Sequence, residues 1–323
     1  MKKTLLASII LMVFSSCQSN YKKTMNEPLA KKIPTKLNYH SDSLTDDYFW
    51  MRLSDDQKES SNPDSQTQDV LDYLVEENQY LDVNMSDTDE LQSKLFDEYV
   101  SRIKQDDSSV PYVENGYTYS SKFEKGEDYR RYYRKKNDDG AKEELFLDLP
   151  KLAEGQKYFS LGDWSISTNN KILAYSTDYL SRREYTIHFK DLVTGEIFVD
   201  QIDNTAGRIT WANDNKTIFY VKKDEQTLRS HKIFKHVLGT DSADDELVFE
   251  ETDETFGCYV YKSKSNQYLF IGSYQTLSTE IRFLDASNPN GNWTIIQPRE
   301  RGLEYSVSHY EDSFFIRTNW NAK

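Results

Sequence analysis

The sequence predicts a mainly β fold in which a β-propeller follows a short helical segment. The first observation behind this prediction is the stretch 163–199, which has the pattern strand, turn, strand, loop, strand, turn, strand. Asn169 and Asn170 mark its first turn, and Gly195, which can take a positive φ at no steric cost, marks its last. Four strands joined in this way are the plan of one propeller blade.

The second observation is that this unit recurs along residues 111–323. Its first turns fall at positions 55, 45, 51 and 45 residues apart: Asn115, Asn170, Asn215, Asn266 and Glu311. Periods of about 40–50 residues with four strands each are typical of propellers, and we expect about five blade units. Four apolar residues of these units are predicted to pack on a neighbouring blade: Trp164, Ile166, Trp211 and Phe219. An ordinary all-β sandwich is the alternative that repetition alone leaves open.

The composition excludes some classes of protein. Hydrophobic residues make up 37% of the 323 residues and aromatic residues 14%, which is enough for β cores despite 29% charged residues. The net charge of −14 repels phosphate backbones, so we expect no nucleic-acid partner. Such a charge would attract basic ligands, and it also serves solubility alone.

The N-terminus has the pattern of a bacterial lipoprotein signal peptide in residues 1–17. Lys2 and Lys3 are followed by a short apolar run and then by Ser15, Ser16 and Cys17. We therefore expect lipidation at Cys17, a membrane contact through this lipid anchor, and a periplasmic or cell-surface location. An ordinary secretory signal that contains a cysteine is the alternative. Residues 18–40 are polar and lysine-rich and are interpreted as a tether.

Residues 41–110 are predicted to form a helical N-terminal segment. An aromatic cluster at 48–52 comes first, and two amphipathic helices follow, with apolar stripes near 70–81 and 91–103. Asp87 and Glu90 have the spacing of a capping box for the second helix. Each stripe needs a surface to pack on, and a self-contained helical hairpin is the alternative to packing on another domain.

No catalytic constellation is present in the sequence. Its glycines are not spaced for G-x-S-x-G, G-x-G-x-x-G or a P-loop, and no histidine precedes a glutamate as in H-E-x-x-H. The five histidines are scattered, and the paired acidic residues have turn-like neighbours. We therefore expect no catalytic residue, no metal site and no cofactor in these residues.

Several motifs together resemble oligopeptidase B, of the prolyl oligopeptidase family of serine peptidases. They are residues 48–52, 70–74, 76–78, 115–119, 178–185, 211–214 and 304–307. The resemblance implies a seven-bladed propeller that covers a C-terminal α/β-hydrolase domain and limits access to short peptides, which are cut after Lys or Arg. It also implies that the N-terminal helices pack on the hydrolase domain.

The resemblance reaches Lys323 before any hydrolase sequence, so no residue of the family's Ser, Asp and His triad can be carried over. We expect an incomplete propeller that is inactive alone and whose partners are that hydrolase domain and short basic peptides. A stand-alone propeller lipoprotein that binds a partner or ligand at the cell surface is the alternative.

The loop 178–184 carries the candidate site residues Arg182, Arg183 and Glu184. Such a loop between the second and third strands of a blade lies on one rim, and the resemblance suggests that this rim faces the hydrolase domain. The three residues are then predicted to make interdomain or substrate-gating contacts, for which an arginine fork is suited. A solvated charged loop is the alternative.

Overall fold

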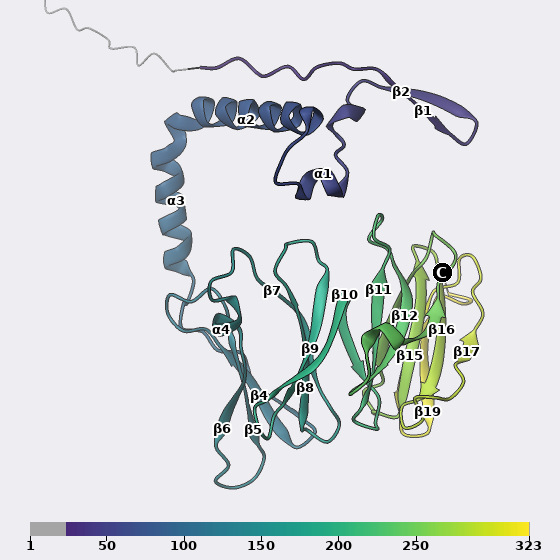
Figure 1. Ribbon diagram of the computed structural model, residues 1–323. Coiled ribbons are helices and arrows are strands. Elements are labelled where there is room, and N and C mark those ends of the chain that lie inside the picture. Colours follow the sequence, from purple (N-terminus) through teal and green to yellow (C-terminus); the bar gives the residue numbers. More distant parts are fainter. Residues whose placement is uncertain (1–23, 323) are drawn as a thin grey trace, which may run out of the picture. The chain divides into compact units, whose positions relative to one another are not determined.

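The computed structural model describes residues 24–322 (Figure 1). The chain divides into two compact units, the first ending at Lys104 and the second beginning at Gln105. The predicted signal peptide and its lipidation residue Cys17 lie outside the described residues, as does the beginning of the predicted tether.

The N-terminal unit contains a β-hairpin followed by helices. Its elements are β1 (Thr35–Tyr39), β2 (Asp42–Asp46), the 3-10 turn η1 (Phe49–Met51), α1 (Asp55–Glu59), α2 (Ser65–Met85), the 3-10 turn η2 (Ser86–Thr88) and α3 (Asp89–Arg102). The two predicted helices are therefore present as α2 and α3. No helix of residues 24–322 is long and apolar enough to cross a bilayer.

Two features of this unit differ from the sequence predictions. The hairpin β1–β2 places residues 35–39, predicted as tether, in a strand. The predicted capping box of Asp87 and Glu90 is wrong, because α2 passes through η2 into α3 without an extended N-cap residue. Thr88, at the N-cap position of α3, has φ −99° and makes no capping bond from its side chain. The capping box of this unit is instead at Ser54, whose hydroxyl accepts from the amide of Gln57.

Trp50 organises the small core of the N-terminal unit. Its indole Nε1 donates to the carbonyl of Lys31 at 2.8 Å, and Gln66 Nε2 donates to the Trp50 carbonyl at 2.7 Å. Lys31 also pairs with Asp69 on α2 at 2.8 Å. The residues before β1 are thereby attached to α2. Of the described residues in this unit, those that are buried are Trp50, Thr67 and Val70.

The second unit is a run of antiparallel blades. Blade 1 contains β3 (Tyr112–Glu114), β4 (Tyr117–Lys122), β5 (Arg131–Lys136) and β6 (Glu143–Asp148), followed by α4 (Leu149–Ala153); blade 2 contains β7 (Ser160–Ile166), β8 (Ile172–Asp178), β9 (Tyr185–Asp191) and the first part of β10 (Ile197–Trp211). Blade 3 contains the rest of β10, β11 (Thr217–Lys223), β12 (Ser230–Val237) and β13 (Glu246–Glu250), with the 3-10 turn η3 (Ser242–Asp244) between the last two.

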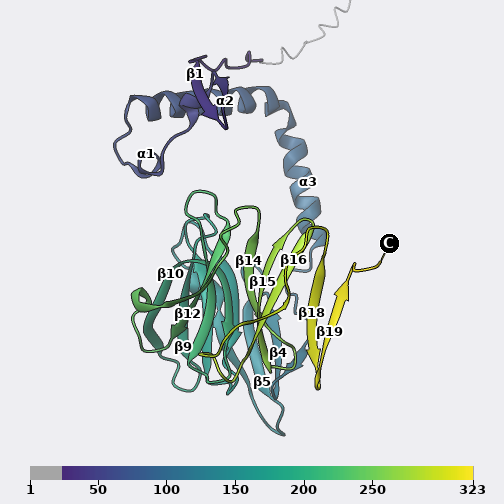
Figure 2. The same cartoon turned by 90° about the vertical axis from the view of Figure 1, so that its right-hand side faces the viewer.

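Blade 4 contains β14 (Gly257–Lys262), β15 (Tyr268–Gln275), β16 (Ser278–Asp285) and β17 (Thr294–Gln297), and the hairpin of β18 (Tyr305–Tyr310) and β19 (Ser313–Thr318) begins blade 5. Figure 1 shows these sheets following one another from β6 to β17, and Figure 2 shows β18 and β19 at the right-hand edge. The prediction of a mainly β propeller with about five blade units is confirmed.

Strand β10 is longer than predicted, because it passes from the outer edge of blade 2 to the inner edge of blade 3. Its register shifts between Thr205 and Ile209. Gly207 lies in this shift at φ 91°, and a Cβ atom there would come within 2.8 Å of the Tyr185 ring. A larger residue would be strained twice, by the positive φ and by the ring. One continuous strand thus joins the two blades.

The five predicted turns share one backbone feature. Each has a residue in the left-handed region, with φ between 46° and 63°: Asn115, Asn170, Asn215, Asn266 and Glu311. Asparagine tolerates this conformation better than most residues, which explains the repeated choice. We call the end of the blades that carries these turns the asparagine rim.

Side chains on the asparagine rim also bond one blade to the next. Asn115 Nδ2 donates to the Thr168 carbonyl at 2.6 Å, and Asn170 Nδ2 donates back to the Asn115 carbonyl at 3.0 Å. Asn215 Oδ1 accepts from the amide of Asn169 at 2.7 Å. The turn asparagines therefore have two roles: they adopt the left-handed backbone conformation of the turn, and their side chains link blades 1, 2 and 3.

A hydrophobic cluster fills each interface between successive blades. Phe146 and Leu173 belong to the first cluster and Ile187 and Tyr220 to the second. The third cluster contains Phe219, and the fourth is formed by Phe270, Ile281, Tyr305 and Val307. All four residues predicted to pack on a neighbouring blade, Trp164, Ile166, Trp211 and Phe219, lie in or against these clusters.

Candidate functional site

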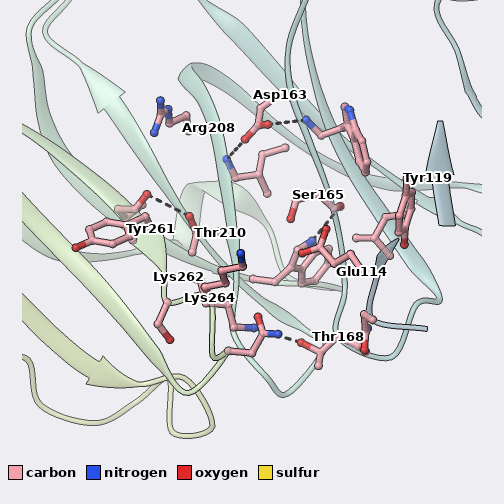
Figure 3. Close-up of a pocket in the computed structure, with 18 of the residues that line it drawn as sticks. Glu114, Tyr119, Asp163, Ser165, Thr168, Arg208, Thr210, Tyr261, Lys262 and Lys264 are labelled. Atoms are coloured by element: carbon pink, nitrogen blue, oxygen red, sulfur yellow. Dashed lines mark hydrogen bonds between the residues drawn. The ribbon is translucent and has the colours of Figure 1, made fainter. Parts of the chain in front are cut away.

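The innermost strands of blades 1 to 4 line a cavity of about 730 Å³ (Figure 3). The cavity is bounded by β3, β7, the second part of β10, and β14. Pockets of roughly 300–1,000 Å³ are the size that proteins use for small ligands. Its charged lining residues are Glu114, Asp163, Arg208, Lys262 and Lys264.

Asp163 connects the inner strands of blades 2 and 3. Its carboxylate accepts from the amide of Trp164 at 2.9 Å and from the amide of Ile209, on β10, at 3.2 Å. Burial raises the pKa of Asp163, and the two amide bonds and the charge of Arg208 act against this rise. Figure 3 shows Asp163 and Arg208 together at one end of the cavity. This carboxylate is a fixed acceptor that also fastens two blades.

Lys262 stands at the end of β14, near the asparagine rim. Its Nζ donates to Thr168 Oγ1, on blade 2, at 3.3 Å. Burial lowers the pKa of Lys262 to about 8, and Asp214 counteracts this only in part. A half-buried ammonium whose one protein acceptor is a neutral hydroxyl is incompletely solvated. Lys262 is therefore the most strongly perturbed cation of this cavity.

Aromatic residues form the apolar part of the wall. Trp211 Nε1 donates to the carbonyl of Ser165 at 3.1 Å, which fixes the indole against blade 2. Trp164 packs on Phe146 with ring centroids 4.9 Å apart. Tyr261, from blade 4, completes this wall and donates its hydroxyl to the carbonyl of Val307 at 3.2 Å. The cavity thus combines rigid rings with separated charges.

The described residues do not form a nucleophile with an oriented base. Burial raises the pKa of the Cys258 thiol to about 12, so it is protonated at neutral pH. Ser265 Oγ lies 2.9 Å from His309 Nδ1, but this pair joins blades 4 and 5, and His309 is enclosed by the rings of Tyr268 and Phe314. No group of three metal-ligating residues is present in residues 24–322.

The loop 178–184 lies on the rim opposite the asparagine rim, between β8 and β9. The Asp178 carboxylate folds it by accepting from the amide of Leu180 at 2.7 Å and from the amide of Arg183 at 2.8 Å. Ser181 and Arg183 take positive φ angles of 63° and 57°. Lys223 Nζ, from blade 3, donates to the Arg183 carbonyl at 2.5 Å. The backbone of this loop is therefore held in one shape.

The predicted site residues stand on this folded loop. Arg183 is exposed, whereas Arg182 and Glu184 are half-buried. None of the three lines the cavity. Their predicted interdomain role stays a prediction. The structure locates the three residues on this rim, and the described residues 24–322 do not include the hydrolase domain that they are predicted to contact.

Sequence reasoning did not select the cavity residues as a site. A signal was available for two of them, since Asp163 and Arg208 each stand seven residues before their turn asparagine, Asn170 and Asn215. Residues at one repeat position of innermost strands face the same channel. Lys262 gave no such signal, because it stands four residues before Asn266 and its contact, Thr168, lies on another blade.

Known proteins share this architecture. Residues 28–323 match the family model described as prolyl oligopeptidase, N-terminal beta-propeller domain. The chain is 38% identical to dipeptidyl aminopeptidase BI of Pseudoxanthomonas mexicana over 98% of its own length and 44% of that protein. It is 33% identical to protease 2 of Moraxella lacunata over 92% of its length and 42% of that protein.

A solved structure gives the same result. The structure of oligopeptidase B from Leishmania major matches with a TM-score of 0.81 and 30% identity, covering 92% of this chain and 43% of that one. The chain therefore spans less than half the length of the relatives it matches. The matched part is their propeller-bearing N-terminal part, and the resemblance drawn from the sequence is confirmed. The chain belongs to the prolyl oligopeptidase family.

Proposed function

We propose that this chain is the gating propeller of a serine oligopeptidase that cuts short peptides after Lys or Arg. The observation that carries the proposal is the match of residues 28–323 to the family's propeller domain, together with the likeness to oligopeptidase B. The chemistry would come from an α/β-hydrolase domain, since acyl transfer needs a nucleophile, a base and oxyanion donors held together. The propeller would select substrates by size and charge.

The proposed partner surface is the rim that carries the loop 178–184. Asp178 holds the backbone of this loop, so Arg183 is presented from a fixed position. A loop whose backbone is already fixed loses less conformational entropy on binding than a mobile loop does, which favours a contact of the Arg183 guanidinium with a carboxylate. Arg182, Arg183 and Glu184 would then contact the hydrolase domain or the entering peptide.

A charge-removal pair tests this surface in a full-length enzyme. Arg183→Met is expected to lower kcat/KM for an arginine peptide about three- to tenfold, by loss of one charge-assisted contact. Lys171→Met, an equal charge change on the asparagine rim, is the control and should leave kcat/KM unchanged. Equal values for wild type and Arg183→Met would contradict the interface.

The decisive test of the proposed activity begins with the reading frame after the codon for Lys323. A continuing hydrolase sequence with G-x-S-x-G supports the proposal, and the full-length enzyme should then cleave an internal Arg-containing peptide. One relative is named a dipeptidyl aminopeptidase, so a dipeptidyl substrate is assayed beside the internal one. A stop codon at this point would favour the stand-alone binding protein.

The 323-residue chain alone is expected to show no peptidase activity. Purified chain is incubated with a fluorogenic arginine peptide, and turnover should equal that of buffer. Turnover at enzyme-like rates that survives further purification would show that these residues contain a catalytic site that neither pattern nor geometry reveals.

We also propose that Cys17 is lipidated and holds the protein on a membrane of a bacterial envelope, facing the periplasm or the outside. The support is the order of Lys2 and Lys3, the apolar run, and Ser15, Ser16 and Cys17. Metabolic labelling with a fatty-acid analogue should mark wild type and not Cys17→Ser. Equal labelling of the two proteins would contradict the anchor.

A further inference from the structure

The cavity carries an excess of cations in a protein that is strongly negative overall. Lys262, Lys264 and Arg208 line it, against the carboxylates of Asp163 and Glu114. The chain as a whole has a net charge of −14, so the net charge of the cavity lining is opposite in sign to that of the protein. None of the three cations lies within 4.0 Å of a carboxylate oxygen of the described residues.

Lys262 is the member of this group with the fewest ways to be solvated. It is half-buried, and its Nζ has a hydroxyl, Thr168 Oγ1, as its acceptor at 3.3 Å. Asp214, the carboxylate that acts on it, is already engaged with Lys216 and Thr217 through three hydrogen bonds. An ammonium group has three donors, so Lys262 has capacity for a further oxygen ligand.

The arrangement in the cavity favours one ligand chemistry. Figure 3 shows Lys262 and Lys264 nearer one end, with Asp163 and Arg208 at the other. A peptide that ends in Lys or Arg carries both a carboxylate and a cationic side chain, so it complements both signs. The rings of Trp164, Trp211 and Tyr261 offer apolar contact to the rest of such a peptide. A phosphate dianion would complement the lysines but carries no cation to pair with Asp163 or Glu114.

We propose that this cavity binds the C-terminal carboxylate of a short peptide ending in Lys or Arg, through Lys262 with Lys264 and Thr168 beside it. Such a peptide is what cleavage after Lys or Arg produces, so the choice of ligand rests on the proposed function. The site would hold a product after cleavage and compete with the next substrate. Binding itself needs no catalytic group and is measured on the 323-residue chain.

The test compares four ligands by isothermal titration calorimetry at pH 7. They are acetyl-Gly-Gly-Arg with a free carboxylate, its C-terminal amide, acetyl-Gly-Gly-Gly with a free carboxylate, and inorganic phosphate. The arginine acid is expected to bind about tenfold more tightly than its amide, through the charge-assisted contact at Lys262. Tryptophan fluorescence gives a second readout, because Trp164 and Trp211 line the cavity.

Variants assign the contact to Lys262. Lys262→Met should bind acid and amide equally, whereas Lys262→Arg keeps the charge and should retain a preference for the acid. Lys216→Met is the matched control, since Lys216 is exposed on the same rim and does not line the cavity. It should bind like wild type. Thermal melts of each variant confirm that the binding change does not come from unfolding.

Several results would overturn the inference. They are equal binding of acid and amide by wild type, absence of binding, an unchanged preference in Lys262→Met, or phosphate binding as tight as that of the arginine acid. The proposed function fails separately, if a full-length enzyme does not cleave after Arg. Because binding is measured on the 323-residue chain and cleavage on a full-length enzyme, the two failures are distinguishable.

Discussion

The two units of this chain use apolar residues in opposite ways. In the propeller unit each blade buries its apolar face against the next, and side chains such as Leu173, Phe219 and Phe270 are fully buried. In the N-terminal unit Val70 is buried but the rest of the α2 stripe and the stripe of α3 are largely exposed, with Leu74 at 51% and Phe96 at 67%. The blades thus supply one another's partners, whereas the helices need a surface that this unit does not contain.

This contrast teaches where the stability of the chain comes from. Burial of apolar surface contributes roughly 25 cal/mol per Å², so the propeller carries most of the hydrophobic free energy. The helices are 21 and 14 residues long, and most of the stability of a helix in a protein comes from the packing of its apolar face. The N-terminal unit is therefore expected to depend on a binding partner, which the proposed function identifies as a hydrolase domain.

The largest effect should separate the two units directly. Phe219→Ala removes a fully buried ring from the interface of blades 3 and 4, and should lower the free energy of unfolding by about 3–5 kcal/mol. Leu74→Ala, on the exposed stripe of α2, should change it by less than about 0.5 kcal/mol. Denaturant unfolding followed by tryptophan fluorescence measures both. Equal losses of unfolding free energy in the two variants would contradict the proposed difference between the units.

The next effect concerns a charged link between blades 3 and 4. Arg299 binds Glu251 through two bonds of 3.2 and 2.7 Å and also bonds Glu280 at 3.3 Å. Burial acts to raise the pKa of Glu251, but the bond from Arg299 holds it below its usual value. Arg299→Met would leave buried carboxylates with fewer partners and should cost about 2–3 kcal/mol, less than a fully buried pair because Arg299 is partly exposed.

Arg301→Met is the control for this change, because Arg301 is exposed in the same loop. It should alter the free energy of unfolding by less than about 0.5 kcal/mol. If both variants behaved alike at pH 7, the pair of Arg299 and Glu251 would be a surface feature and not a link between blades.

Removal of the charge of Lys262, in the cavity, should raise the free energy of unfolding, whereas Phe219→Ala and Arg299→Met should lower it. The folded protein binds a proton at Lys262 less tightly than the unfolded chain does, since burial lowers this pKa from 10.5 to about 8. The charged form therefore opposes folding below pH 8, and this cost disappears as pH rises from about 8 to 10.5. Lys262→Met should stabilise the protein at pH 7 by about 1–2 kcal/mol, after allowance for solvent screening.

The pH profile is the sharper part of this prediction. The difference in melting temperature between Lys262→Met and wild type should shrink between pH 8 and 10. Buried tyrosines and Cys258 titrate at higher pH in both proteins, so the difference isolates Lys262. Lys216→Met should show no such trend. A difference that grows with pH would mean that the sign assigned to Lys262 is wrong.

The smallest effect tests the turn asparagines. Asn170→Gly keeps the positive φ but removes the bond to the Asn115 carbonyl, and should cost about 1 kcal/mol. Asn204→Gly is matched, because Asn204 also has a positive φ, 57°, and is exposed. It should stay within about 0.5 kcal/mol of wild type. Equal losses would show that backbone conformation alone, and not the bond between blades, explains these asparagines.

The propeller was predictable because its signals are local. A turn asparagine recurs in blades 1 to 4, and the left-handed backbone at Asn115, Asn170, Asn215 and Asn266 is what that residue type tolerates. The hairpin β1–β2 was missed for the converse reason, since its turn is made by His40 and Ser41 at φ 47° and 80° without Asn or Gly. The asparagine or glycine signal that marks the blade turns is absent there.

The candidate site was less predictable than the fold. Lys262 meets Thr168 across 94 residues of sequence, and the cavity exists only once four inner strands are side by side. Pattern reasoning selected the loop 178–184 because of its charges. The sequence could not identify Lys262, because its role depends on having a hydroxyl, and no carboxylate of the described residues, within hydrogen-bond distance. Which groups surround a side chain is known only from the folded structure.

Hydrogen–deuterium exchange of the purified 323-residue chain, followed by mass spectrometry, tests the contrast between the units most directly. We expect slow exchange in the central strands β8, β11 and β15, most of whose side chains are buried, and fast exchange throughout α2 and α3. Protection of α2 and α3 equal to that of these strands would contradict it, because the helices would then be stable without the partner that their exposed stripes require.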